Sequence, residues 1–279
     1  MEKDENRFKL SKEDHELIYK LIEKQVFKGK NTSNAPIATV LGGQPGSGKF
    51  ILINESKSEF EEEDIVIING DEYRRMHPKC KEILRENEED FAFYTDADVR
   101  IWTARIFDKA INDKYNFIFE GTMRNNRICD TLKRLKENGF YVKVKALSVN
   151  GIDSSISTIE RYEAQKRIEG HGRMAPTKSH KAAYYGMLDT LKDIENESCF
   201  DELKIFNRNK ELIYFNNLKE KNIYSKYNLG IYETLIKNRD EIKPSMKNIE
   251  ERLNKISEIK KSRGEELIKI EDILKNIEE

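Results

Sequence analysis

IATVLGGQPGSGK, residues 37–49, is the most informative stretch of this chain. Its first six residues form a short apolar run, which is typical of a strand covered on both faces of a sheet. A glycine-rich turn follows that fits GxxxxGK, a pattern whose backbone N–H groups surround phosphate oxygens while the lysine reaches the transferable phosphate. The stretch therefore predicts a strand, a phosphate loop and a helix, with nucleotide contacts from Gly43, Gln44, Pro45, Gly46, Ser47, Gly48, Lys49 and Phe50.

Strand-like runs and amphipathic stretches alternate along the rest of the chain. Further strand-like runs lie at residues 65–68, 117–119, 141–149, 203–208 and 211–215. Helical spacing of apolar residues appears at residues 11–27, 97–113, 126–138, 156–168 and 179–194. This alternation predicts an α/β fold of the P-loop NTPase or kinase-like type, a parallel sheet flanked by helices, with extra C-terminal helices.

The C-terminal part of the chain has a different character. We expect residues 1–243 to form a P-loop kinase domain with an N-terminal helix, and residues 244–279 to form a helical C-terminal extension. In that extension the apolar residues keep a spacing of three and four: Ile249, Leu253, Ile256, Leu267, Ile270, Leu274 and Ile277. The spacing indicates a helix packed on the body or on a partner, or a solvated amphipathic helix; we favour the solvated helix.

The composition excludes several classes of protein. The chain has 50 basic and 51 acidic residues, so it lacks the basic excess of a general nucleic-acid binder. No apolar run approaches the roughly 18 residues that a membrane span needs, and the charged N-terminus does not resemble a secretory signal. The cysteines Cys80, Cys129 and Cys199 are far apart and form no CxxC motif. We expect a cytoplasmic protein in a reducing compartment, without nucleic-acid or membrane partners.

Phe50 departs from the phosphate-loop pattern. P-loop NTPases usually have Ser or Thr at this position, and its hydroxyl binds Mg²⁺. Because magnesium keeps several waters, water, Ser47 or a nearby carboxylate would have to complete its coordination. The alternative is an enzyme with reduced or lost turnover, in which Phe50 packs under the loop.

Polar residues follow the next two predicted strands. Asp71 comes after the second strand, and Glu120, Thr122 and Arg124 come at the end of the third. Ligands of open parallel sheets gather at the carboxyl ends of strands, so a carboxylate there could bind magnesium through water or accept a proton from an attacking hydroxyl. A helix N-cap is an equally good interpretation of Asp71. We assign Asp71, Glu120, Thr122 and Arg124 to a polar, hydroxyl-bearing substrate.

Two arginines flank a predicted break between a helix and a loop. Arg161 lies in TIERYE and Arg173 in GRMAP. Arginines placed over a phosphoryl group stabilise the charge that spreads over its oxygens. In a chain with 50 basic residues, a surface position is the alternative for either one.

Together these motifs resemble the zeta toxin family, the toxin halves of bacterial toxin–antitoxin pairs, which are P-loop kinases. The segments that carry the resemblance occur in family order: LGGQPGSGK (41–49), VIINGDEYRRMHP (66–78), FEGTMR (119–124), TIERYE (158–163), GRMAPTKSH (172–180) and FDELKIFNRNKELIY (200–214).

The resemblance implies an ATP- or GTP-dependent kinase that uses Mg²⁺ and phosphorylates a sugar hydroxyl of UDP-N-acetylglucosamine, which drains a cell-wall precursor. It implies that Lys49 holds the nucleotide phosphates and that Asp71 is the general base. It also implies that Glu120 and Thr122 line the sugar-nucleotide site, and that Arg161 and Arg173 stabilise the transferring phosphoryl group. A small helical antitoxin that blocks the nucleotide site is the implied partner.

Two other functions remain open from the sequence. One is a P-loop kinase for a different small hydroxyl compound. The other is a nucleotide- or antitoxin-binding protein that does not turn over, with Phe50 as its marker.

Overall fold

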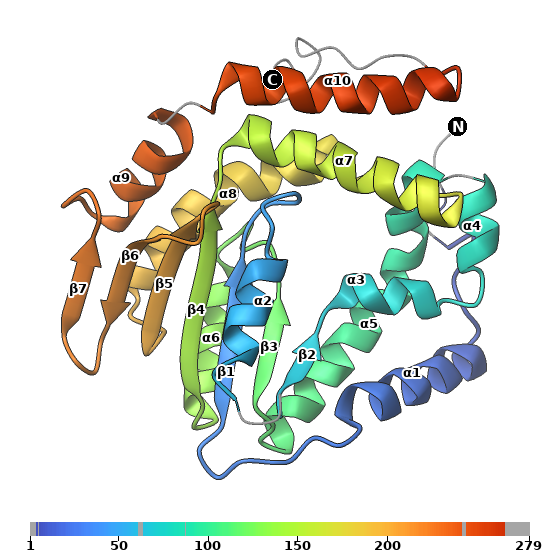
Figure 1. The fold of residues 1–279 in the computed structure, drawn as a ribbon. Coiled ribbons are helices and arrows are strands. Elements are labelled where there is room, and N and C mark those ends of the chain that lie inside the picture. Colours follow the sequence, from blue (N-terminus) through green and yellow to red (C-terminus); the bar gives the residue numbers. More distant parts are fainter. Residues whose placement is uncertain (1–3, 5, 61–63, 87, 242–243, 266–279) are drawn as a thin grey trace.

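A seven-stranded sheet forms the centre of the molecule (Figure 1), in a computed structural model that describes Asp4 and residues 6–60, 64–86, 88–241 and 244–265. The strands are β1 (Ile37–Gly42), β2 (Val66–Ile68), β3 (Phe117–Glu120), β4 (Tyr141–Ser148), β5 (Glu202–Asn207), β6 (Leu212–Asn217) and β7 (Asn222–Ser225). Their order is β2-β3-β1-β4-β5-β6-β7. The strands from β2 to β5 in this order are all parallel to one another. β6 pairs antiparallel with β5, and β7 pairs antiparallel with β6.

The predicted α/β fold is therefore confirmed, with one difference at the β6 and β7 edge. A short turn joins β5 to β6, and so short a connection allows only antiparallel pairing. The sequence analysis did not predict β7, whose four residues show no alternation between buried and exposed positions.

Helices cover both faces of the sheet. They are α1 (Lys12–Phe27), α2 (Phe50–Lys57), α3 (Gly70–Tyr73), α4 (Cys80–Glu86), α5 (Phe91–Asn112), α6 (Arg127–Glu137), α7 (Gly151–Glu169), α8 (Thr177–Asn196), α9 (Ile231–Ile236) and α10 (Met246–Ser262). Ser11 caps α1 through its hydroxyl, which accepts a hydrogen bond from the Asp14 backbone N–H at 3.1 Å. None of the described helices is long and apolar enough to cross a bilayer.

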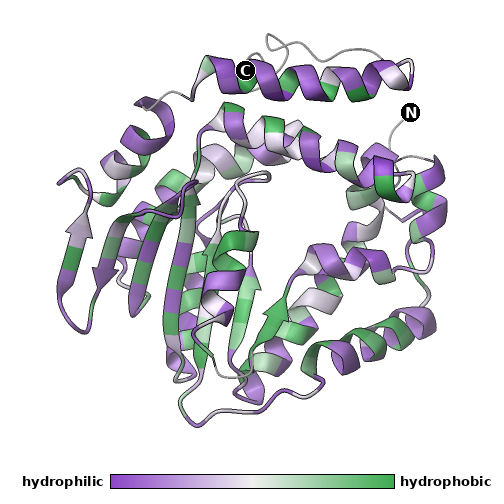
Figure 2. Ribbon diagram, viewed as in Figure 1, coloured by the Kyte–Doolittle hydropathy of each residue, from purple (hydrophilic) through white to green (hydrophobic). Residues whose placement is uncertain are grey.

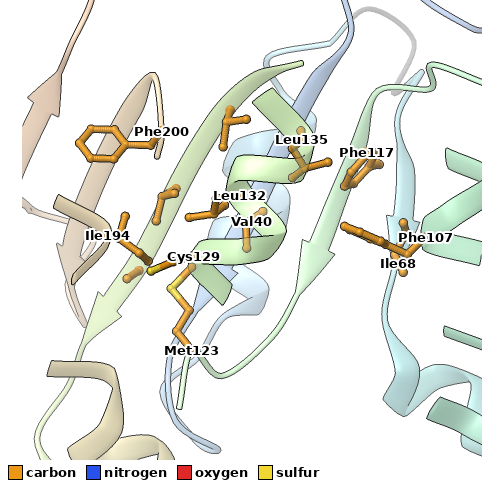
Figure 3. Packing of buried hydrophobic residues seen from close by; sticks show 14 of the residues in the cluster. Val40, Ile68, Phe107, Phe117, Met123, Cys129, Leu132, Leu135, Ile194 and Phe200 are labelled. Atoms are coloured by element: carbon orange, nitrogen blue, oxygen red, sulfur yellow. The ribbon is translucent and has the colours of Figure 1, made fainter. Parts of the chain in front are cut away.

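The buried core lies mainly on one side of the sheet. Successive residues of β1 point to opposite faces, so Ala38 and Val40 join the larger cluster while Leu41 joins a smaller cluster beneath α2. In Figure 3, Leu132 and Leu135 of α6 lie over the strands of this larger cluster. Burial on both faces explains the apolar runs of β1 and β3, which are mostly green in Figure 2.

The C-terminal helix α10 runs along α7 (Figure 1). Ile249, Leu253 and Ile256 are buried against α7. The helix is therefore packed on the body, and the solvated helix that we favoured is wrong because its apolar face is covered. The remaining apolar residues of the predicted extension, Leu267, Ile270, Leu274 and Ile277, lie outside the described residues.

Candidate functional site

A cavity of about 1790 Å³ opens at the carboxyl edge of the parallel strands. Its wall includes Lys49, Asp71, Glu120, Arg161 and Arg173, and it also includes Thr122 and Arg124. The structure thus brings the predicted acceptor and arginine residues together with the phosphate loop. Ligand pockets usually measure roughly 300–1,000 Å³, so this cavity has room for a nucleotide and a second substrate.

The phosphate loop joins β1 to α2 and needs glycine at its centre. Gly46 has a φ of +77°, and a Cβ on it would lie 1.9 Å from the backbone oxygen of Ser154 in α7. A side chain there would both strain the backbone and collide with α7. The loop therefore lies directly on α7, and its sequence is fitted to that approach.

The buried side chain of Gln44 holds the start of the phosphate loop by donating two hydrogen bonds. Gln44 is fully buried, and its Nε2 donates to the Val149 backbone oxygen at 2.8 Å and to Ser154 Oγ at 3.1 Å. Ser154 Oγ also lies 2.8 Å from Nε2 of His180 in α8. Burial, with a smaller effect of Arg239, lowers the pKa of His180 to about 4, so the ring is neutral near pH 7. The Gln44 side chain thus fixes the loop.

Lys49 points back into the cavity. Its Nζ donates to the Gly43 backbone oxygen at 2.7 Å and lies 3.9 Å from Glu120 Oε1. Burial lowers the pKa of Lys49, and the carboxylates of Glu120 and Asp71 oppose that effect. An anionic phosphate would offset the cost of burying this ammonium group, as expected for the lysine of a phosphate loop.

Phe50 begins α2 and is 70% exposed at the wall of the cavity. The alternative in which Phe50 packs under the loop is therefore wrong, because the ring faces outward. A phenyl ring also offers no oxygen to a metal ion.

Asn69, rather than Asp71, caps the short helix after β2. Its Oδ1 accepts a hydrogen bond from the Asp71 backbone N–H at 2.9 Å, and its Nδ2 donates to Glu120 Oε2 at 2.6 Å. The N-cap interpretation of Asp71 is therefore wrong, and its carboxylate is left facing the cavity. The amide of Asn69 connects the ends of β2 and β3, so it fixes the orientation of the Glu120 carboxylate.

Asp71 forms an ion pair with Arg173 across the cavity. Arg173 Nη1 lies 2.7 Å from Asp71 Oδ2, and Arg74 Nε lies 3.3 Å from Oδ1. Burial would raise the pKa of Asp71, but the two arginines outweigh it and lower the pKa. Glu120 shows the opposite balance, because burial raises its pKa more than Lys49 lowers it. The two carboxylates of the site are thus electrostatically distinct.

The two candidate arginines come from α7 and from the loop that follows it. Arg161 makes no hydrogen bond or ion pair with any other residue in the described part of the chain, and desolvation followed by repulsion from Arg173 lowers its pKa. The Arg173 loop is held by its own backbone N–H, which donates to Gln165 Oε1 at 2.9 Å. Nε of Arg173 is buried without a partner. Both guanidinium groups thus retain unused donors beside the cavity.

Arg124 and Thr122 lie at the other end of the site, after β3. Arg124 is exposed and, among the described residues, has no hydrogen bond or ion pair. A free guanidinium at a cavity wall suits an anionic ligand group.

The oxygen donors of the site fit Mg²⁺ only in part. Within residues 4–265, apart from the undescribed positions, no group of three or more acidic, histidine or cysteine side chains could hold a metal ion. Magnesium needs only one or two protein oxygens when nucleotide phosphates and water supply the rest. The Ser47 hydroxyl is buried without a partner, and the carboxylates of Glu120 and Asp71 face the cavity. The two carboxylates line the cavity and could take the place of the missing hydroxyl at Phe50, whereas Ser47 does not line it.

Sequence reasoning missed several residues that build this site. Asn69 could have been found, because Asn before Gly-Asp-Glu is a good N-cap signal. His180 and Arg208 gave no local signal, because their roles depend on contacts with residues far away in the sequence. Gln165 gave none either, because its contact depends on how the loop after α7 folds back.

Comparison with known proteins identifies the family of this chain. The zeta toxin family model matches residues 23–219. This chain belongs to the zeta toxin family. The chain is 27% identical over 250 residues to another member, Toxin zeta of Enterococcus hirae, and the match covers 86% of each sequence. It is 30% identical over 189 residues to Toxin PezT of Streptococcus pneumoniae, covering 67% of this chain and 74% of that protein.

Solved structures agree with this zeta-family assignment. A structure from the PezAT chromosomal toxin–antitoxin system of Streptococcus pneumoniae superposes with a TM-score of 0.75 at 25% identity, covering 89% of this chain and 98% of that one. The AvrRxo1-ORF1:-ORF2 complex gives a TM-score of 0.58 at 9% identity, covering 96% and 88%, and shows a shared fold alone. The resemblance and the fold class are confirmed.

Proposed function

We propose that this chain is a kinase that transfers the γ-phosphoryl group of ATP or GTP to a sugar hydroxyl of UDP-N-acetylglucosamine, and that it acts as the toxin of a cytoplasmic toxin–antitoxin pair. The observation that carries the proposal is the single cavity shared by Lys49, Asp71, Glu120, Arg161 and Arg173. A phosphate loop, a carboxylate and two arginines at one edge of a parallel sheet are the parts that phosphoryl transfer requires.

The phosphate loop and Lys49 would hold the nucleotide. The loop N–H groups and the N-terminus of α2 attract phosphate oxygens, because the first N–H groups of a helix lack partners within it. Mg²⁺ would supply charge neutralisation to the phosphates when bound. Glu120, together with water, is the residue that would hold it, because Asp71 is needed as the base.

Asp71 would accept the proton of the attacking hydroxyl. The hydroxyl oxygen forms a bond to the γ-phosphorus, the bond from that phosphorus to the bridging oxygen breaks, and the nucleoside diphosphate leaves. At rest, Arg173 holds the Asp71 carboxylate at 2.7 Å and lowers its pKa. Once Arg173 turns to the phosphoryl group, Asp71 loses a cation and becomes a stronger base. The same movement thus adds charge to the phosphoryl group and basicity to Asp71.

The acceptor would lie on the β2 and β3 side of the cavity. Glu120, oriented by Asn69, can accept a hydrogen bond from a sugar hydroxyl, and Thr122 can do the same or donate. The exposed guanidinium of Arg124 suits the diphosphate of a nucleotide sugar. UDP-N-acetylglucosamine is the acceptor that the family resemblance favours.

An antitoxin partner also belongs to this proposal. The PezAT structure comes from a toxin–antitoxin system, and the PezT relative is named as a toxin. We infer that a small helical antitoxin covers the nucleotide side of the cavity in this chain.

Two variants and a control test the proposal. We expect Lys49→Ala to abolish transfer to UDP-N-acetylglucosamine and to weaken ATP binding measured by titration calorimetry with Mg²⁺. We expect Asp71→Asn to keep ATP binding but to lose about 100-fold or more in transfer rate, as loss of a general base does. Asp113→Asn, an exposed carboxylate outside the cavity wall, is the matched control.

The outcomes separate the competing functions. Normal transfer by the Asp71 variant would refute the base assignment. Transfer to another hydroxyl compound alone would show a different kinase. ATP binding without transfer to any acceptor would favour a binding protein, a function that the exposed Phe50 ring also fits.

A further inference from the structure

The C-terminal helix α10 is attached to α7, the helix that carries Arg161. Its buried residues Ile249, Leu253 and Ile256 pack on Ile156 and Ile159 of α7. α7 also touches the phosphate loop through Ser154, so it forms one wall of the nucleotide side. The contact between α10 and α7 therefore adjoins the nucleotide side of the cavity, so a change in this contact can affect that wall.

Arg252 is the polar centre of this contact. Its Nη1 donates to Asp153 Oδ1 at 2.8 Å, and its Nε and Nη2 donate to the Glu160 carboxylate at 2.8 and 2.7 Å. Two carboxylates thus neutralise the guanidinium group. Nη2 also donates to Ser157 Oγ at 2.8 Å, and Ser157 lines the cavity. Arg252 therefore connects α10 to a residue of the cavity wall.

Ser157 shares its hydroxyl oxygen with a second arginine. Arg208 Nη2 donates to Ser157 Oγ at 2.5 Å, and the Ser157 hydroxyl itself donates to the Asp153 backbone oxygen at 2.9 Å. The hydroxyl thus accepts from two cations. Of the two arginines, only Arg252 forms close ion pairs, with Asp153 and Glu160, among the described residues.

Arg208 makes no close ion pair with any described residue, and the carboxylates of Asp153 and Glu160 attract it only from farther away. Its Nη1 is buried and has no partner, and burial lowers its pKa. The residue follows β5 in a tight turn, where Asn207 Oδ1 accepts hydrogen bonds from the N–H groups of Asn209 and Glu211. The turn directs Arg208 back toward α7 and the cavity. A partly desolvated guanidinium without an ion pair is costly, and a ligand can offset that cost.

The strand order indicates which end of a nucleotide meets Arg208. The proposed acceptor residues follow β2 and β3, which lie on one side of β1, while β4 and β5 lie on the other side. A nucleotide whose γ-phosphate faces Asp71 must extend its nucleoside end toward β4 and β5. Arg208, at the end of β5, lines that part of the wall.

We propose that Arg208 contacts the base of the donor nucleotide, and that α10 positions Arg208 through Arg252 and Ser157. This proposal rests on the nucleotide binding of the proposed function. The planar guanidinium group stacks on the face of a nucleotide base and gains a partner for its buried charge. α10 is then a part of the nucleotide site that does not itself touch the nucleotide.

Four variants of the full chain test the proposal. Three of them change the connection from α10 to the proposed base contact: Arg252→Gln, Ser157→Ala and Arg208→Gln. The fourth, Arg263→Gln, is the matched control. Arg263 ties the end of α10 to Glu163 of α7, but it does not contact Ser157. The dissociation constants for ATP and for inorganic tripolyphosphate are measured by titration calorimetry, and the melting temperature of each variant is recorded.

We expect Arg208→Gln to weaken ATP binding about tenfold, the effect of losing one stacking contact, without changing tripolyphosphate binding. Ser157→Ala and Arg252→Gln should weaken ATP binding several-fold in the same selective way. Arg263→Gln should lower the melting temperature and leave both constants unchanged. Ser157→Ala removes one hydroxyl only, so it keeps the test valid if the Arg252 variant does not fold.

Four results would overturn the proposal. Unchanged ATP binding by Arg208→Gln, in a wild-type protein that binds ATP, would overturn this inference alone. Equal loss of tripolyphosphate binding would make Arg208 a phosphate contact. If Arg263→Gln lost as much ATP affinity as Arg252→Gln, α10 would act through its packing on α7 as a whole and not through Arg252 and Ser157. A wild-type protein that binds neither ATP nor GTP would overturn the proposed function as well.

Discussion

Replacement of His180 by glutamine tests how the phosphate loop is held. His180 Nε2 lies 2.8 Å from Ser154 Oγ, and the same hydroxyl accepts a hydrogen bond from Gln44 of the loop. Burial, together with Arg239, lowers the pKa of His180 from 6.5 to about 4. The neutral ring is therefore the form that the folded protein stabilises.

The magnitude follows from that difference. At 1.36 kcal/mol for each pKa unit, a change from 6.5 to about 4 corresponds to roughly 3 kcal/mol of folding free energy. Because the pKa is lower in the folded protein, this stability is fully present above pH 6.5 and is lost as the pH falls toward 4. Protonation would place a charge beside Ser154 and disturb the support of Gln44.

Urea unfolding at pH 8 and pH 4.5 measures the effect. We expect the free energy of unfolding of the wild type, relative to His180→Gln, to fall by roughly 2 to 3 kcal/mol between these two pH values. His171→Gln, in the loop after α7, is the control for the removal of a histidine elsewhere in the chain. A difference between wild type and the His180 variant that stays constant across this range would refute the reasoning.

Three further predictions concern the site directly. Phe50→Thr should tighten Mg²⁺-dependent ATP binding and raise transfer; unchanged values would mean that other oxygens already complete the metal site. Gly46→Ala should destabilise the protein by about 2 kcal/mol more than Gly139→Ala in urea unfolding. Both glycines have a φ of +77°, but only at Gly46 would the added Cβ collide with a carbonyl oxygen, that of Ser154, at 1.9 Å. Equal losses would show that the close approach has no cost. Arg173→Gln should move the acid limb of the transfer rate to higher pH, because it removes the cation that lowers the pKa of Asp71; an unmoved limb would argue against Asp71 as the base.

The fold could be predicted from local patterns because each central strand is buried on both faces. The apolar runs at residues 37–42 and 141–149 leave few alternatives to buried strands, and the glycine spacing after the first run identifies the loop. The fold of the chain near residues 70–86 was harder to predict. Helices α3 and α4 are too short for a hydrophobic period to appear.

The site could be predicted as far as residues lie at strand ends. Asp71 and Glu120 were found because parallel strands bring their carboxyl ends to one edge. The Asp71–Arg173 pair and the Ser154–His180 contact could not be found, because they join residues that are distant in sequence. The covered face of α10 was also missed, because periodicity shows that a face is apolar but not whether something covers it.

The central position of β1 divides the cavity wall into two sets of loops. The loops after β2 and β3 carry the acceptor candidates, and those after β1, β4 and β5 carry the donor candidates. Since each set belongs to separate segments of the chain, the acceptor loops can diverge while the donor loops stay as they are. A protein with this arrangement can acquire a new acceptor through changes at the start of the segments after β2 and β3, and a protein engineer can graft a new specificity onto it in the same way.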